Sequence, residues 1–249
     1  MKFDFEYGVC DFSAVEDKLI NCRNKEKLPN NAKSIILFAF PYKINDEKPK
    51  NISRYAAVAD YHIIVMEYLN SIIDDLKKEY PNNKFVGFTD NSPIPEVFAA
   101  VNAGLGVRGK NGLLINDKYG SFVFIGEIVT DLYIKSTGQY NECLNCGLCK
   151  EKCPVALCKE KCLSAVTQKK KLLSESEQEL IRNNGSVWGC DICSEVCPMN
   201  KNKAKSNIKE FIECYRNEYV VGEDSVNRPY NWRGEAVITR NHNILCGKL

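Results

Sequence analysis

Eight of the 13 cysteines, seven in two spaced groups and one between them, can bind iron–sulfur clusters. The first group reads CxxCxxCxxxCP, and the second reads CxxCxxxCP after a lone intervening cysteine. In the bacterial ferredoxin pattern the fourth cysteine of each run ligates the other cluster. We therefore predict two 4Fe–4S clusters, one held by Cys143, Cys146, Cys149 and Cys197, the other by Cys190, Cys193, Cys153 and Cys162.

Two alternatives to this ligand set stay open. Structural zinc modules with four cysteines also use CxxC steps, although three cysteines at two-residue gaps and two CxxxCP tails favour iron–sulfur. Cys158 competes with Cys162 for the second cluster, although a ligand only five residues beyond Cys153 would strain the loop. The other cysteines are predicted to be apolar fillers or exposed thiols: Cys10, Cys22, Cys214 and Cys246.

The composition bounds the class of protein. A chain of 249 residues with 44% hydrophobic residues can bury one sizeable core and a small second module. The first six residues contain no apolar stretch typical of a signal peptide, and the apolar run 35–40 is too short to cross a membrane. We therefore expect a cytoplasmic protein with reduced thiols. A net charge of +2 attracts RNA only weakly, so any contact with RNA must come from local patches of basic residues.

Hydrophobic patterning predicts an α+β fold. Strands are expected at 34–40, 84–89, 112–116 and 122–130, and helices at 55–80, at 95–102 and, with a capping box at its start, at 174–183. The polar segment 135–142 predicts a boundary. The predicted domains are 1–138 (an α/β catalytic domain), 139–203 (a ferredoxin-like cluster domain) and 204–249 (a C-terminal extension).

Several polar residues of the first domain are candidates for a site. Asp90 follows a predicted strand, where site residues often lie, but a simple Asx turn explains it equally well. Tyr55, Tyr61 and His62 could line a pocket, although a histidine near a helix start is commonly a capping or surface residue.

A glycine-rich segment formally matches the dinucleotide-binding pattern GxGxxG. That pattern requires a preceding strand and a following helix, whereas here the predicted order is reversed, so NAD binding is disfavoured. We expect these glycines to let the backbone approach a large cofactor or cluster closely. The segment contains Gly104, Gly106, Gly109 and then Lys110.

Taken together, these motifs resemble one family, the cobalamin-dependent epoxyqueuosine reductases of tRNA queuosine synthesis, which have two 4Fe–4S clusters and are relatives of the reductive dehalogenases. The resemblance runs from about residue 54 to residue 200. Its pieces are Ser53-Arg-Tyr55-Ala, Asp60-Tyr-His62, Thr89-Asp90-Asn-Ser-Pro93, the glycine segment up to Asn116, Gly120-Ser-Phe-Val-Phe-Ile-Gly-Glu127, and the cysteine groups up to Asn200.

The resemblance implies a cobalamin held base-off between the first domain and the cluster domain. Its candidate contacts are Tyr55, Tyr61, His62, Gly104, Gly106, Gly109 and Lys110. It also implies that the clusters deliver electrons to cobalt, that Co(I) attacks the epoxide-bearing ring, and that Asp90 protonates the departing oxygen. Asp90 could do this near neutral pH only if burial raised its pKa above about 3.9.

The resemblance also suggests partners and one departure from the family. Family members usually continue into a helical-repeat region that grips tRNA, whereas here only a stub around residues 231–234 is expected, so we predict a short form. The expected partners are tRNA and a low-potential electron donor such as a flavodoxin or ferredoxin, with no membrane and a monomeric chain. The alternatives are a related reductase with another substrate, such as an organohalide, and a cobalamin-free electron-transfer protein.

Overall fold

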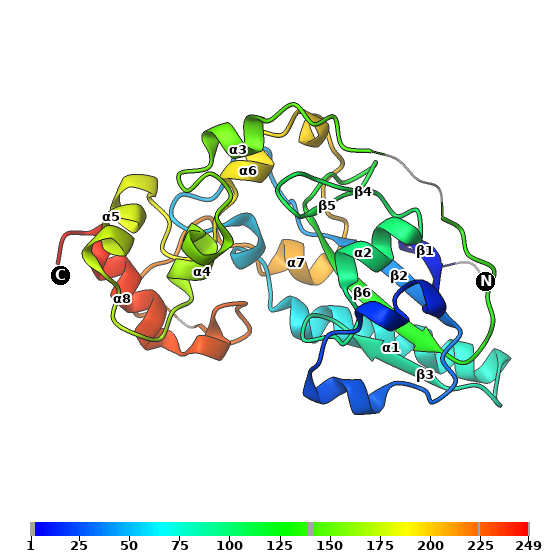
Figure 1. Ribbon diagram of the computed structural model, residues 1–249. Helices are drawn as coiled ribbons and strands as arrows, with labels where there is room; N and C mark the ends of the chain where they lie inside the picture. The colour runs from blue at the N-terminus through cyan, green and yellow to red at the C-terminus, as the bar shows by residue number, and fades with distance from the viewer. Residues whose placement is uncertain (1–2, 139–141, 224, 249) are drawn as a thin grey trace. The chain divides into compact units, whose positions relative to one another are not determined.

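The computed structural model describes residues 3–138, 142–223 and 225–248, and the chain folds as two units, of which the first combines strands with helices and the second is built of helices (Figure 1). The first unit contains residues 1–41 and 61–145, and the second contains 42–60 and 146–249. The predicted polar boundary at 135–142 includes residues 139–141, which lie outside the described residues. The inclusion of 42–60 in the second unit was not predicted from the sequence.

The first unit is built on a four-stranded antiparallel sheet with strand order β1-β2-β6-β3 (Figure 1). All eight residues of β2 are buried, because α1 and α2 both pack on strands of this sheet. The described strands are β1 (Glu6–Asp11), β2 (Ser34–Pro41), β3 (Phe85–Phe88), β4 (Val107–Arg108), β5 (Leu114–Ile115) and β6 (Val123–Thr130).

Two helices and several short turns accompany this sheet. α1 buries an apolar stripe of Val65, Leu69, Ile73 and Leu76, which is the spacing of one helix face. The elements are α1 (Tyr61–Glu79), α2 (Glu96–Asn102) and the 3-10 turns η1 (Phe12–Ala14), η2 (Glu16–Lys18) and η3 (Arg23–Lys27). The strands predicted at 34–40, 84–89 and 122–130 and the helix at 95–102 are confirmed to within two residues.

The start of α1 was predicted six residues too early. The segment before Tyr61 forms a single 3-10 turn, η4 (Arg54–Ala56), and then an irregular stretch. Its backbone groups bond within the second unit: the Ala57 carbonyl accepts from the backbone N–H of Arg216, and the Asp60 N–H donates to the Asn227 carbonyl. These tertiary bonds replace the helical ones, which a local pattern cannot reveal.

The short strands β4 and β5 form a separate two-stranded sheet directly after α2. Gly106 has φ +157, and a Cβ there would lie 2.4 Å from the carbonyl oxygen of Ile115. This glycine is therefore needed for the hairpin itself. The sequence predicted β5 within 112–116, but it predicted neither β4 nor β1.

The second unit consists of short helices around two small apolar clusters. Trp188 is fully buried in one cluster, together with Ile52 and Ile238, and Ile181 lies in the other. The helical elements are α3 (Leu148–Lys152), η5 (Lys159–Lys161), α4 (Leu163–Thr167), α5 (Glu175–Asn184), α6 (Ile192–Glu195), η6 (Pro198–Asn200), α7 (Lys209–Glu213), η7 (Asn231–Arg233) and α8 (Glu235–Leu245).

The predicted capping box of α5 is confirmed. The Ser174 hydroxyl accepts from the Glu177 backbone N–H, and the Glu177 side chain accepts from the Ser174 N–H. Each bond satisfies a helix-end donor that would otherwise lack a partner. In the part of the chain that is described, no helix combines the length and the apolar character that a membrane span requires.

Candidate active site and cluster ligands

Asp90 lies in a tight loop between β3 and α2. Asp90 and Asn91 have φ values of 51 and 40, so two successive residues other than glycine adopt the left-handed conformation. Aspartate and asparagine tolerate this conformation better than most residues. The Asp90 carboxylate bonds locally, because its Oδ1 accepts from the Asn91 backbone N–H at 2.8 Å. The loop is strained, and such strain is common at functional sites.

The first two residues of α1 contact the Asp90 carboxylate. The Tyr61 hydroxyl donates to Asp90 Oδ2 at 3.1 Å, and His62 Nε2 lies 3.1 Å from the same oxygen. The Tyr61 ring stacks on Phe124 of β6 with 4.1 Å between centroids and 9° between planes. The fold therefore brings together three predicted site residues, although Asp90 follows His62 by 28 positions in the sequence.

The pKa of Asp90 moves in the direction opposite to the sequence expectation. The hydrogen bond with His62 is the largest favourable influence, and together with the Asn91 N–H and the Tyr61 hydroxyl it lowers the pKa to about 2. Burial acts in the other direction but is too small, since the Asp90 side chain is 59% exposed. The expectation that burial raises the pKa of Asp90 is therefore wrong, and Asp90 is ionised at neutral pH.

Two further carboxyl groups lie next to this loop and were missed from the sequence. Burial, followed by the charge of Asp90, raises the pKa of Glu96 to about 7. Glu127 is fully buried in β6, and burial raises the pKa of its carboxyl well above its usual range. The Ser92 hydroxyl donates to Glu127 Oε2 at 2.5 Å. A lone glutamate inside the apolar strand 123–130 was the available sequence signal for Glu127.

The other predicted cofactor contacts are distributed between the two units. Gly104, Gly106 and Gly109 border the β4–β5 hairpin, and Lys110 Nζ donates to Asn145 Oδ1 at 3.0 Å. Tyr55 belongs to the second unit, where burial raises the pKa of its phenol. A cofactor role for these five residues stays a prediction.

Seven of the eight predicted cluster ligands lie in the second unit, and Cys143 lies in the first. Burial and then the nearby charges of Asp191, Cys193 and Cys162 raise the pKa of Cys190 to about 12. Three predicted ligands of the second cluster are thus electrostatic neighbours. The Cys158 thiol instead donates to Glu160 Oε2 at 3.3 Å. Among the described residues, no three His, Cys, Asp or Glu side chains are arranged to hold a single metal ion.

Arg54 organises the segment that carries Cys190 and Cys193. Its backbone N–H donates to Asp191 Oδ2 at 2.6 Å, and its guanidinium pairs with Glu195 of α6. The remaining guanidinium N–H groups donate to the carbonyls of residues 45, 46 and 47. Arg54 is 4% exposed, so its charge is buried, and hydrogen bonds to Glu195 and to three carbonyls compensate for the loss of water.

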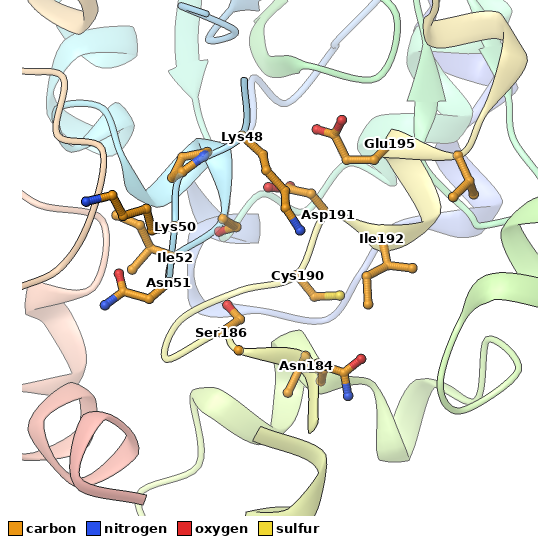
Figure 2. A pocket seen from close by; sticks show the side chains of 15 residues that line it. Lys48, Lys50, Asn51, Ile52, Asn184, Ser186, Cys190, Asp191, Ile192 and Glu195 are labelled. Atoms are coloured by element: carbon orange, nitrogen blue, oxygen red, sulfur yellow. The ribbon is translucent and has the colours of Figure 1, made fainter. Parts of the chain in front are cut away.

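A cavity of about 350 Å³ opens beside this segment. Figure 2 shows the side chains of Lys48, Cys190 and Asp191 around it. Burial raises the pKa of Asp191 to about 6. The cavity thus combines a predicted cluster ligand with basic and acidic side chains in the second unit.

Comparisons with known proteins identify the family. The family model described as "Epoxyqueuosine reductase QueG, DUF1730" matches residues 23–91, which include Tyr61, His62 and Asp90. The epoxyqueuosine reductase of Leadbetterella byssophila is 34% identical over 77% of this chain and 66% of the relative. That of Synechocystis is 34% identical over 75% of this chain and 69% of the relative.

Solved structures show the same fold. The epoxyqueuosine reductase of Streptococcus thermophilus superimposes with a TM-score of 0.80 at 24% identity, over 96% of this chain and 76% of the other. An epoxyqueuosine reductase with an epoxyqueuosine-modified tRNA-Tyr stem loop superimposes with a TM-score of 0.78 at 21% identity, over the same shares.

The matches cover only part of the length of the relatives. The chain spans 66% of the Leadbetterella protein and 61% of the relative from Cyclobacterium marinum, less than two thirds of their lengths. The Synechocystis relative is matched over more than two thirds of its length at 34% identity. The chain therefore belongs to the epoxyqueuosine reductase family.

Proposed function

We propose that this chain reduces epoxyqueuosine in tRNA to queuosine. The observation that carries the proposal is the hydrogen-bonded group of Tyr61, His62 and Asp90, which lies within the family match and presents a partly exposed proton-transfer site. The side chains of His62 and Asp90 are 33% and 59% exposed, so a substrate can reach them.

The role of the site follows from the chemistry of the reaction. Opening an epoxide and losing its oxygen as water requires an acid that protonates the departing oxygen. Because the pKa of Asp90 is lowered to about 2, its carboxylate does not keep a proton of its own at neutral pH. We assign the acid to the Asp90–His62 pair, in which His62 Nε2 lies 3.1 Å from Asp90 Oδ2 and can carry the proton that the carboxylate does not keep.

The cysteines fit iron–sulfur clusters by their donor chemistry. We propose that Cys143, Cys146, Cys149 and Cys197 hold one cluster and that Cys190, Cys193, Cys153 and Cys162 hold the other. Cys162 is close to Cys190, which supports Cys162 as a ligand of the second cluster. The thiol of Cys158, the alternative ligand, instead forms a hydrogen bond with Glu160. Bound clusters supply single electrons, and a cobalamin supplies the cobalt centre for the reductive step.

The resemblance and the fold match support the rest of the proposal. We propose that a cobalamin contacts Tyr61 and His62, with Tyr55, Lys110 and the glycines Gly104, Gly106 and Gly109 as further candidates. A structural neighbour carries an epoxyqueuosine-modified tRNA-Tyr stem loop, which makes a tRNA anticodon arm the substrate to test. A flavodoxin or ferredoxin is the proposed electron donor.

Product analysis tests the proposed reaction. Protein loaded with iron, sulfide and cobalamin is reduced chemically and incubated with a stem-loop RNA that carries epoxyqueuosine. Mass spectrometry of the nucleosides should show a product lighter by one oxygen atom, and an organohalide in parallel should stay unchanged. Unmodified substrate after incubation with fully loaded protein would contradict the proposal.

A further inference from the structure

The carboxyl groups of Glu96 and Glu127 lie beside the Asp90 loop and have no role in the reaction proposed above. Glu96 is in the first turn of α2, where the backbone N–H of Asp90 lies against its carboxylate. Glu127 lies on β6 and accepts from Ser92, two residues after Asp90. The two glutamates therefore hold the strained loop at Asp90 and at Ser92.

Three buried oxygen atoms around this loop have no hydrogen-bond donor among the described residues. Glu96 Oε1, Glu127 Oε1 and the hydroxyl of Thr89 are each sealed from solvent, and none has a hydrogen-bond partner among the described residues. Two ionised carboxylates here would leave buried negative charge without compensation, which is costly. A proton on each glutamate removes the charge and adds a donor, so the arrangement favours neutral carboxylic acids.

The charges that act on Glu96 come from three other elements. They are Asp90 in the loop, His62 on α1 and Glu127 on β6. The interaction with Glu127 is mutual, because the charge of Glu96 raises the pKa of Glu127. The charged residues on the other elements packed on α2 are not among the causes of the Glu96 shift: β2 and β5 carry none, β1 and β4 carry Glu6, Asp11 and Arg108, and Lys18 of η2 lies over the Phe98 ring. Asp90 and Glu96 therefore face the same imidazole.

We propose that Glu96 is a positioning residue for Asp90: it holds the loop as a neutral carboxylic acid, and when it ionises it competes with Asp90 for the positive charge of His62. The proposal rests on the role assigned to the Asp90–His62 pair. With Glu96 neutral, the charge of His62 interacts with Asp90 alone. With Glu96 ionised, two carboxylates face one imidazolium, which then releases its proton less readily.

The pH dependence follows from the pKa of Glu96, which burial raises to about 7. Below that pH Glu96 is neutral, and above it Glu96 carries a charge that raises the proton affinity of its neighbours. Single-turnover reduction should therefore slow as pH rises through about 7, by up to about tenfold per pH unit. In Glu96→Gln the part of this decline that comes from Glu96 should disappear, because the amide has the same shape and does not ionise, whereas the loss of the proton from the Asp90–His62 pair remains.

Histidine resonances report this coupling without any substrate. The chain has two histidines, His62 and His242, so a His242→Gln variant assigns both ring signals. In wild-type protein labelled with ¹³C-histidine, the His62 titration should show an inflection near the pKa of Glu96. Glu96→Gln should lose this inflection. Glu67→Gln should keep it, because the same change is made on an exposed residue of α1.

Identical His62 titrations in wild type and Glu96→Gln would overturn the proposal. A second measurement uses the wild type alone, so it gives a result even if Glu96→Gln does not fold. Infrared difference spectra between about pH 6 and about pH 8 should show loss of a carboxylic-acid carbonyl band. The absence of this loss would also overturn the proposal. Failure of the proposed function instead appears as unreduced RNA while the His62 coupling is present.

Discussion

Asp90 and Glu96 are six residues apart, yet their pKa values shift in opposite directions. Asp90 is more than half exposed and receives three hydrogen-bond donors, so its charged form is stabilised. The Glu96 carboxyl is largely desolvated and faces the negative charge of Asp90, so its neutral form is stabilised. Two carboxyl groups with separated pKa values in one site are a common basis for acid–base chemistry.

The raised pKa of Glu96 makes a prediction for stability. The folded chain keeps the Glu96 proton between about pH 4.5 and about 7, where the unfolded chain has released it. Its contribution to stability is therefore complete below the unfolded pKa and is lost as pH rises through the folded pKa. Glu96→Gln should be more stable than wild type at about pH 8, by on the order of 2 kcal/mol. Melting temperatures of both proteins across pH test this, and parallel curves would contradict it.

The choice between Cys162 and Cys158 is a second test at the scale of one residue. Cys162→Ala should lose the second cluster and about half of the iron, because Cys162 is a neighbour of Cys190. Cys158→Ala should keep full iron content, since its thiol bonds to Glu160. Iron analysis and paramagnetic resonance of both variants decide the matter, and the reverse pattern would exchange the assignment.

At the scale of elements, local patterns predicted those structures that depend on local causes. The apolar run of β2 and the capping residues of α5 are such cases. β1 was missed because Glu6–Asp11 mixes polar and apolar residues and is held by pairing with β2. The start of α1 was misplaced because residues 54–60 bond to segments more than 100 positions away. Neither kind of long-range pairing is visible in a short window.

The capping box of α5 provides a test at this scale. Ser174→Ala removes the acceptor for the Glu177 N–H and should destabilise the first turn of α5 by about 1 kcal/mol. Amide hydrogens of that turn should then exchange about fivefold faster. Ser176→Ala is the matched control, because Ser176 bonds the Ser174 hydroxyl rather than a backbone N–H at the helix end, and it should leave exchange nearly unchanged. Equal exchange in both variants would show that the cap contributes little.

The candidate site shows the same limit of sequence reasoning. Tyr61, His62 and Asp90 were identified because they lie in recognisable motifs, and the structure places them within hydrogen-bonding distance. Glu96 and Glu127 were not identified because their importance comes from burial, which depends on how α2 packs against β6. The direction of the Asp90 pKa was wrong for the related reason that exposure and partners are tertiary properties.

At the scale of the whole molecule, the proposed function divides between the two units. The first unit holds the Asp90 site and the second holds seven of the eight predicted cluster ligands. The segment 42–60 joins them in sequence, since it follows β2 of the first unit and contributes Arg54 to the segment around Cys190. Because the chain spans less than two thirds of two relatives, its activity on tRNA has to be measured directly.

Single-turnover reduction of epoxyqueuosine in a stem-loop RNA by wild type and Asp90→Asn tests the central claim most directly. Chemically reduced protein with equal iron and cobalamin content bypasses the electron donor, and Glu67→Gln is the control for loss of one carboxylate in the same unit. Asp90→Asn should react about a hundred- to ten-thousand-fold more slowly, because an amide cannot share and deliver the proton. Equal rates in Asp90→Asn and wild type would remove Asp90 from the mechanism.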